Sequence, residues 1–317
     1  MLADVVALGE LLIDFATVQT DLDGYPVMAA HPGGAPANFL AAISKFGGKA
    51  ALLGKVGADT FGKLLLGTLG KVGIDTSGMV VTDDVFTTLA FVTFDAHGDR
   101  SFAFSRKPGA DTCLTFEELD LSLIDVAKVF HFGTLSLTDE PARSATRQAV
   151  AYARKAGKLI TYDPNLRKPL WASLEAAKEQ LLWGLSQADI VKISDEEVDF
   201  LFGLNAEEGA QYIFEHYGAK LIFVTCGADG CYFKNKNAQG HVPGLSGIQV
   251  IDTTGAGDIF GGSAVWKMLQ FHKSPDALAE EELRQIVRFA CTAASLSTTK
   301  PGGIFSVPDL ETIEKLM

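Results

Sequence analysis

Short apolar runs alternate along the chain with longer segments in which hydrophobic residues recur at helical spacing. The apolar runs predict buried strands at residues 5–8, 51–54, 129–132, 159–162, 190–193 and 221–225. Helices are predicted at residues 61–72, 140–156 and about 281–297. Because the strands are almost continuously apolar, both faces of the sheet must be covered. The pattern predicts an α/β fold with a mostly parallel central sheet that helices cover on both faces.

Two segments interrupt this alternation. Residues 87–107 contain two strand-like runs around a glycine-containing turn, which predicts a β-hairpin. Together with residues 11–31 it is expected to form a small β appendage on the main domain. The period of two places Phe102, Phe104 and Arg106 on one face of the hairpin. These side chains would either pack that small sheet or present aromatic rings and a cation to a substrate.

Composition narrows the choice of function. The 317 residues include 47% hydrophobic residues, which suffices for a large core, and the net charge is −12. That charge argues against a nucleic-acid partner and against a membrane surface, because either would require a basic face. The cysteines lack the spacing of a metal site or a disulfide framework, as is typical of buried thiols in a reducing cytoplasm. No signal peptide or membrane-length apolar run is evident, so a cytoplasmic protein with no membrane partner is expected.

The most distinctive motif is Asp-Thr-Thr-Gly-Ala-Gly-Asp at residues 252–258. It lies between an apolar run at 248–251, which predicts a strand, and a helix-like run at 259–269. Its two glycines permit a tight turn and leave backbone N–H groups bare at a helix N-terminus, where an anion binds favourably. Asp258 would repel a phosphate there unless it had its own task, such as accepting a proton from a hydroxyl that attacks the phosphate. The alternative is a capping Asp on an ordinary helix.

A second motif, Gly33-Gly34-Ala-Pro-Ala-Asn38, opens a predicted helix. The paired glycines permit close backbone approach to a ligand, and Asn38 supplies both a donor and an acceptor. Ordinary helix-start chemistry explains the same residues equally well. Asp14 is an isolated acid in an apolar run, which is costly to bury without a partner. It would either lie at an exposed sheet edge or bind the hydroxyl groups of a polyol.

Two familiar nucleotide-binding motifs are excluded. Residues 57–63 match most of a P-loop, but Leu64 stands where a Ser or Thr would hold magnesium. No Gly-x-Gly-x-x-Gly fingerprint follows a strand, because Phe260 occupies the third position after Gly257. A dinucleotide site of the Rossmann type is therefore not expected.

With these motifs, the chain resembles the ribokinase-like (PfkB) carbohydrate kinase family over essentially its whole length. The resemblance is carried by residues 33–38, 56–62, 225–230 and 252–258. It implies a ribokinase-like three-layer α/β/α fold with a mostly parallel central sheet. It also implies that residues 1–317 form a single kinase domain, into which a lid made of about 11–31 and 87–107 is inserted.

The resemblance implies transfer of the γ-phosphoryl group of ATP to a sugar hydroxyl. Asp258 would be the general base, and the N–H groups of Gly255, Ala256 and Gly257 would form the anion hole. The residues implied in sugar binding are Asp14, Gly33, Gly34, Asn38, Phe102, Phe104, Arg106, Asn165 and Arg167. Those implied on the nucleotide side are Lys192, Ser194, Thr225, Gly227, Gly230 and Ala294.

Metal ions and a partner subunit are also implied. Glu197 matches the family acid that organises Mg²⁺ through water, although Ser194 stands where many relatives carry Asn. Asp252 and Thr254 match a loop that binds a monovalent cation such as K⁺ in relatives. A homodimer through the lid is expected, because an exposed sheet edge tends to pair with another strand.

The identity of the sugar rests on smaller features. The surroundings of Arg106, Arg167 and Lys192 are similar to those in the fructokinases of this family, which favours phosphorylation of D-fructose to D-fructose 6-phosphate. The two arginines could instead neutralise a carboxylate, as in a 2-keto-3-deoxygluconate kinase, and ribokinase is a third candidate. Relatives that use the keto acid often carry tyrosines at Phe102 and Phe104, which favours the neutral sugar. A non-catalytic sugar sensor is the alternative of a different class, but the intact Asp258 speaks against it.

Overall fold

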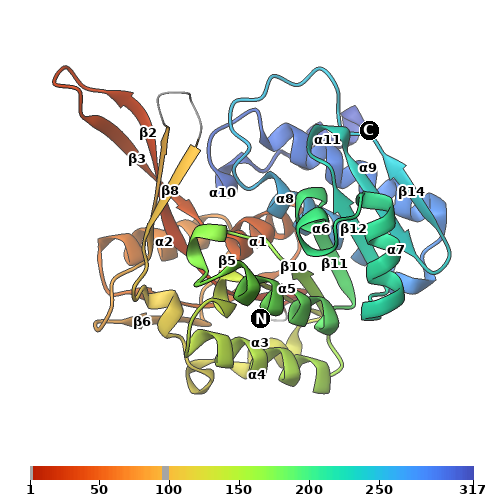
Figure 1. The fold of residues 1–317 in the computed structure, drawn as a ribbon, viewed down its shortest axis with the longest axis horizontal. Helices are drawn as coiled ribbons and strands as arrows, with labels where there is room; N and C mark the ends of the chain where they lie inside the picture. Colours follow the sequence, from red (N-terminus) through yellow and green to blue (C-terminus); the bar gives the residue numbers. More distant parts are fainter. Residues whose placement is uncertain (1–2, 95–99) are drawn as a thin grey trace.

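The structure is a computed structural model that describes residues 3–94 and 100–317. Within those residues a ten-stranded sheet runs through the molecule, and a separate four-stranded sheet stands beside it (Figure 1). The strands of the large sheet are β1 (Val5–Leu8), β4 (Ala50–Gly57), β5 (Ile74–Asp75), β6 (Met79–Thr82), β9 (Val129–Gly133), β10 (Leu159–Asp163), β11 (Ile190–Ser194), β12 (Leu221–Thr225), β13 (Cys231–Asn235) and β14 (Gln239–Val242).

The large sheet is mostly parallel, as the sequence predicts. Its main path has the order β14-β13-β12-β11-β10-β9-β1-β4-β5, and β6 pairs with β4. All neighbours from β12 to β5 are parallel, whereas β13 and β14 are antiparallel additions at one edge. Because the parallel strands end at one edge of the sheet, the residues that follow them gather there.

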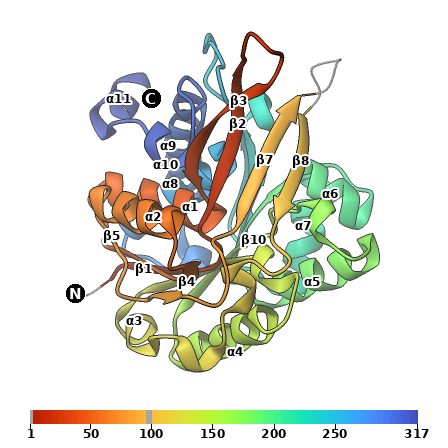
Figure 2. The ribbon, with the colours of Figure 1, turned by 90° about the vertical axis from the view of Figure 1, so that its left-hand side faces the viewer.

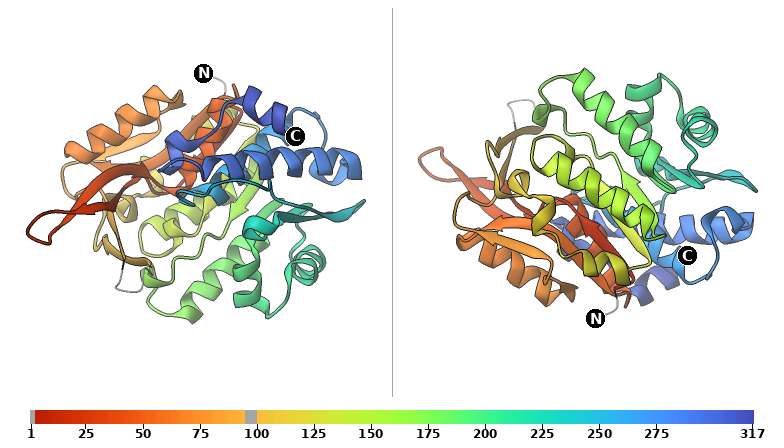
Figure 3. Two further views of the ribbon diagram at one scale, coloured as in Figure 1. Left: turned by 90° about the horizontal axis from the view of Figure 1, so that it is seen from above. Right: turned by 90° about the horizontal axis from the view of Figure 1, so that it is seen from below.

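Helices cover both faces of the large sheet, and Figure 3 shows the molecule from these opposite sides. One face carries α3 (Leu121–Val126), α4 (Ala142–Lys155), α5 (Leu174–Gln187), α6 (Asp195–Phe202) and α7 (Ala206–Tyr217). The other carries α1 (Ala35–Lys45), α2 (Thr60–Lys71), α8 (Ala256–Leu269), α9 (Glu280–Ser297), α10 (Gly303–Ser306) and α11 (Leu310–Leu316). Short 3-10 helices are η1 (Ala110–Cys113), η2 (Phe116–Glu118), η3 (Leu135–Leu137), η4 (Lys168–Leu170), η5 (Gly227–Asp229) and η6 (Pro275–Ala277). Among the helices of the described residues, none combines the length and the hydrophobicity needed to traverse a lipid bilayer.

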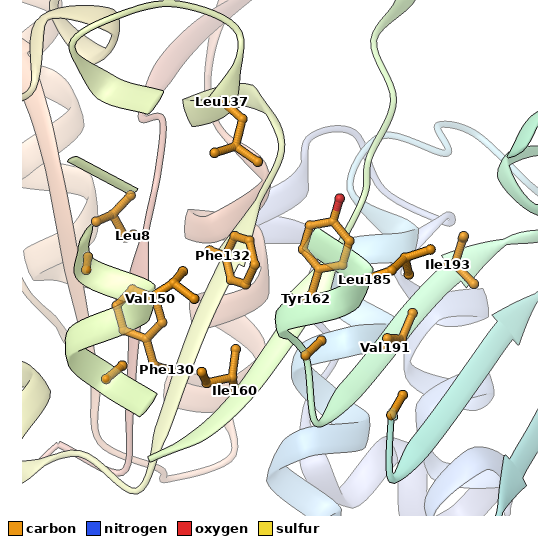
Figure 4. Close-up of a cluster of buried hydrophobic side chains, with 14 of the residues drawn as sticks. Leu8, Phe130, Phe132, Leu137, Val150, Ile160, Tyr162, Leu185, Val191 and Ile193 are labelled. Carbon is orange, nitrogen blue, oxygen red and sulfur yellow. The ribbon is translucent and has the colours of Figure 1, made fainter. Parts of the chain in front are cut away.

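The core lies on both sides of the large sheet because successive side chains of a strand point to opposite faces. Leu8 joins Phe130 and Tyr162 in the cluster between the sheet and the α3–α7 layer (Figure 4). Val5 and Ala7, from the same strand, are buried against the opposite layer. Continuous apolar strands are therefore required, as the sequence pattern indicates.

The small sheet consists of β2 (Leu12–Thr20), β3 (Pro26–Gly33), β7 (Leu89–Phe94) and β8 (Arg100–Ser105), in the order β3-β2-β7-β8 (Figure 2). It comes from the two segments that interrupt the strand–helix alternation. Phe15 anchors it to the main body by stacking on Phe91 at 5.4 Å between ring centroids and meeting Phe61 of α2 edge-on at 5.5 Å. The small sheet is thus packed against the start of α2 at one end.

The predicted strand at residues 248–251 is wrong. This segment is irregular, and the side chains of Val250 and Ile251 are more than half exposed. The N–H groups of Ile251 and Asp252 donate to the carbonyl of Thr298, just after α9, rather than to a neighbouring strand. Ile248 and Val250 line a cavity, which explains an apolar run outside the core. The strand that is present before it, β14, has the polar sequence Gln-Gly-His-Val and was not predicted.

Candidate active site

Helix α8 begins at Ala256, whose N–H donates to the carbonyl of Thr253 at 3.2 Å. Gly255 precedes it with φ of +76°, a left-handed conformation that favours glycine. A Cβ at Gly257 would lie only 2.9 Å from Nζ of Lys192, so the ammonium group faces the backbone at this turn. Helix N-terminal N–H groups and a neighbouring cation together favour an anion.

Asp258 lies in the first turn of α8 and is 9% exposed. Nδ2 of Asn38 in α1 donates to its Oδ2 at 2.9 Å. Burial raises the pKa of Asp258, while the hydrogen bond from Asn38 and the charges of Lys192 and Arg167 oppose the rise. A buried carboxylate with a raised pKa and a nearby anion site is a candidate general base.

A buried ion pair lies beside this turn. Nζ of Lys192, in β11, is 3.1 Å from Oδ2 of Asp163, the last residue of the neighbouring strand β10. Burial raises the pKa of Asp163 to about 7 even though Lys192 opposes it. Burial alone would lower the pKa of Lys192, but the surrounding carboxylates, with Asp163 first, raise it above its usual value. Lys192 therefore stays charged at neutral pH.

On the other side of Asp258, the small sheet and the start of α1 form a second polar region. Asp14 of β2 lies directly over Gly33, where any Cβ would overlap its carboxylate. Gly34 caps α1 with φ of +118°, and a Cβ there would overlap the carbonyl of Glu10. Burial raises the pKa of Asp14 to about 6, Arg167 lowers it, and Asp258 raises it further. The structure thus brings Asp14, the diglycine, Asn38 and Asp258 together, as the sequence predicts for a sugar site.

A cavity of about 740 Å³ extends from the other side of the α8 turn. It is lined by all six predicted nucleotide-side residues and by several others of the predicted site, namely Asn165, Arg167, Lys192, Ser194, Glu197, Thr225, Gly227, Gly230, Ala256, Gly257 and Ala294. A volume of this size suits a drug-sized or nucleotide-sized ligand. Its polar end lies at Lys192 and the N-terminus of α8.

The apolar wall of this cavity was missed by sequence reasoning. It includes Phe200, Leu245, Ile248, Val250 and Cys291. The available signal was the apolar run at 248–251 beside Gly247, which was interpreted as a strand. Such a wall suits the flat face of an aromatic base.

Arg106 is not directed at the cavity. The guanidinium is buried after β8, where Nε donates to Asp111 at 2.8 Å, Nη1 to Thr138 at 2.7 Å and Nη2 to the carbonyl of Leu135 at 2.8 Å. Its contact with substrate stays a prediction. The same holds for Phe104, which pairs with Ala90 in the small sheet, and the side chain of Phe102 lies outside the described residues.

Comparison with known proteins decides the family. The sequence model described as pfkB family carbohydrate kinase matches residues 2–310. Fructokinase-2 of Solanum lycopersicum is 42% identical over 310 residues, which cover 96% of this chain and 93% of that protein. The chain belongs to the pfkB family of carbohydrate kinases. The prediction of a carbohydrate kinase is confirmed.

Two solved structures show the same fold as this pfkB-family kinase. The fructokinase of Xylella fastidiosa with bound ATP is 32% identical with a TM-score of 0.90, covering 99% of this chain and 98% of that chain. The fructokinase of Vibrio cholerae O395 in its fructose-, ADP- and calcium-bound form is 30% identical with a TM-score of 0.86, covering 99% of each chain. The ribokinase-like three-layer α/β/α fold with a small separate sheet is therefore confirmed.

The residues predicted to organise metal ions in this kinase are hydrogen-bonded within the protein. Glu197 accepts the N–H of Leu166 at 2.7 Å and that of Ser194 at 2.9 Å, the latter within a capping box of α6. Asp252 accepts the N–H of Thr254 at 2.9 Å and that of Gly302 at 3.1 Å. These carboxylates order the loops on either side of the cavity.

Proposed function

We propose that the protein is an ATP-dependent fructokinase, which transfers the γ-phosphoryl group of ATP to D-fructose and forms D-fructose 6-phosphate. The observation that carries the proposal is the 42% identity to a fructokinase over nearly the full length of both chains. The site agrees with it, because the polar region around Asn38 and Asp258 and a nucleotide-sized cavity meet at the α8 turn.

In this mechanism Asp258 accepts the proton of the attacking sugar hydroxyl. Phosphoryl transfer passes through a loose transition state, so positioning and charge stabilisation matter more than the strength of the base. The N–H groups of Gly255, Ala256 and Gly257, with Lys192 beside them, would stabilise the transferring group. To do so, the N–H of Ala256 would have to leave the carbonyl of Thr253, to which it donates at 3.2 Å. The small sheet would act as a lid that closes over the sugar and excludes water.

The cavity fits ATP and its magnesium ion. Lys192 and the α8 N-terminus suit the phosphates, and the apolar wall suits the base. Glu197 already binds two backbone N–H groups, so the proposal places it around Mg²⁺ through water rather than as a direct ligand. Mg²⁺ would neutralise the developing charge on the phosphates. K⁺ is proposed near Asp252 and Thr254, whose mutual hydrogen bonds shape the loop before α8.

The setting of Arg106 favours a neutral sugar. A keto acid would be expected to recruit both predicted arginines, yet Arg106 is buried against Asp111 and Thr138. Arg167, which is exposed at the cavity and acts electrostatically on Asp14 and Asp258, remains for contact with a phosphate or a sugar hydroxyl.

A coupled ATP-consumption assay tests the choice of sugar. The panel contains fructose, 2-keto-3-deoxygluconate, ribose, tagatose and a reaction without sugar. We expect kcat/KM for fructose to exceed that for every other compound. A higher value for the keto acid would overturn the fructokinase proposal and make Arg167 a carboxylate ligand.

Assembly and location complete the proposal. The β2–β3 hairpin of the small sheet carries the exposed apolar side chains Val18, Leu22 and Tyr25, and β3 is an edge strand, which supports a homodimer through this sheet. Sedimentation showing only a 33.8 kDa species at micromolar concentration would contradict the dimer. The four cysteines are free thiols, which supports a cytoplasmic location.

A further inference from the structure

The amide of Asn38 is joined to the carboxylate of Asp258 although the two residues are 220 positions apart. Both side chains are buried, at 4% and 9% exposed. A carboxylate can only accept, so the donor Nδ2 must face Asp258 and Oδ1 must point elsewhere. The hydrogen bond to Asp258 therefore fixes which way the amide of Asn38 is turned.

Oδ1 of Asn38 is buried and has no hydrogen-bond partner within the described residues. It faces the first residue of α10, because a Cβ at Gly303 would overlap it. A hydroxyl from outside the chain therefore does not reach this oxygen. The amide is held by the hydrogen bond to Asp258 at Nδ2 and by backbone packing at Oδ1.

Two glycines hold the amide in place. A Cβ at Gly255 would lie 3.0 Å from Nδ2 of Asn38. At Gly303, the first residue of α10, any Cβ would overlap the Asn38 amide itself. The chain segment after α9 therefore presses its bare backbone against this side chain, and no larger residue fits there without moving it.

We propose that Asn38 is a positioning residue for Asp258. Its Nδ2 fixes the orientation and ionisation of the base. Gly303, the first residue of α10, supports this arrangement from behind. The inference rests on the proposed kinase function and adds to it a residue that positions the base.

The surrounding charges are compatible with this role. Lys192 and Arg167 favour the ionised form of Asp258, whereas Glu197 disfavours it. Asp14 and Asp163 lie close enough for their own pKa values to be raised by Asp258. Among these opposing influences the Asn38 hydrogen bond is the largest that lowers the pKa of Asp258.

The first test is Asn38→Ala, with kcat and KM for fructose measured between about pH 5 and pH 9. The acid limb of kcat reports the base in the substrate complex. Loss of a hydrogen bond to a charged group should lower kcat by about 10- to 100-fold and move the acid limb to higher pH by about one unit. A rise in KM with kcat and the acid limb unchanged would show that Asn38 only binds sugar, and would overturn the proposal.

Gly303→Ala tests the same positioning of the base without altering Asn38 or Asp258. Gly303 is not in the positive-φ region, so alanine is tolerated by the backbone and acts through the overlap with Asn38. We expect a smaller change in the same direction, with the acid limb again moved upward. Gly67→Ala in α2, where a Cβ would meet nothing within 4 Å, is the matched control and should leave both quantities unchanged. An unchanged acid limb in Gly303→Ala would contradict the support assigned to that residue.

A measurement without turnover separates this inference from the proposed function. The Asp258 carboxyl carbon can be titrated by ¹³C NMR in the sugar-free protein, with its signal assigned by its loss in Asp258→Asn. Asn38→Ala should raise the pKa of that signal whichever sugar the kinase uses. An unchanged titration in a folded variant would overturn the inference and leave the fructokinase proposal intact. A wild-type protein that is inactive on fructose would overturn the fructokinase proposal and leave this inference intact.

Discussion

Nζ of Lys192, in the middle of β11, lies 3.1 Å from Oδ2 of Asp163, the last residue of the neighbouring parallel strand β10. The same ammonium group faces the backbone at Gly257, which belongs to the proposed anion site. Asp163, Glu197 and Asp258 all act on its pKa. Lys192 therefore neutralises buried carboxylates and, in the proposed mechanism, would offer a positive charge to a phosphate, so its removal should affect catalysis more than binding.

Lys192→Met is expected to lower kcat by about 10²-fold or more, because preorganised charge in a water-poor site stabilises the transition state strongly. It should also move the acid limb of kcat to higher pH, since Lys192 lowers the pKa of Asp258. Steady-state kinetics with varied ATP and fructose measure both effects. Lys168→Met is the matched control, because Lys168 lines the same cavity but is exposed. Equal losses in the two variants would contradict a special role for Lys192.

Asp258→Asn should abolish most turnover while leaving both substrates bound. General bases contribute about 10²- to 10⁴-fold, so kcat should fall within that range. Asn keeps the shape of the side chain, and calorimetry should show that fructose and ATP affinities change little. Turnover close to wild type would remove Asp258 as the base. Sugar binding without turnover in the wild-type protein would support a sugar sensor.

The strand–helix alternation was sufficient to predict the large sheet, because runs such as 5–8 and 129–132 are buried on both faces and must be apolar throughout. The prediction failed at 248–251 because this apolar run lines a cavity and is not part of the buried sheet. An apolar run also suits a ligand cavity, and periodicity cannot distinguish the two. The polar strand β14 was missed because, as an edge strand, it requires little burial.

The sequence indicated candidate site residues where a residue's type is dictated by its backbone, as at Gly34 and Gly255, and where a motif places an acid at a helix N-terminus, as at Asp258. Arg106 shows the limit of such reasoning. The period of two gives the face of a strand, but not the buried acid that binds the guanidinium. Asp111 is five residues further along, and only the three-dimensional structure shows the pair.

Glu10→Gln should make stability less dependent on pH. Glu10 is 3% exposed and accepts the N–H of Ala35 at 2.8 Å, and burial raises its pKa to about 7. A carboxyl group whose folded pKa lies above its unfolded value stabilises fully at pH below the unfolded value, and that contribution is lost as pH rises through about 7.

Glutamine resembles the protonated acid, so Glu10→Gln should match wild type near pH 5 and be more stable near pH 8, by at most about 3 kcal/mol. Urea unfolding at the two pH values measures the difference. The Glu10→Gln variant should still lose some stability with rising pH, because burial also raises the pKa values of Asp14 and Asp163. Glu117→Gln, at an exposed position, is the control and should show no such gain. A variant that is less stable than wild type at pH 8 would contradict the argument.

Arg106→Met and Arg167→Met should have opposite effects on stability and catalysis. Arg106 is 4% exposed and pairs with Asp111 at 2.7 Å, and removing one partner of a buried pair costs about 3–5 kcal/mol. Its loss should lower the denaturation midpoint strongly, with KM for fructose little changed in the folded fraction.

Arg167 is exposed at the cavity, so its loss should leave stability within about 0.5 kcal/mol of wild type and reduce kcat/KM. Chemical denaturation and steady-state kinetics on both variants measure these effects. A rise in KM for Arg106→Met without a loss of stability would show that Arg106 contacts the substrate.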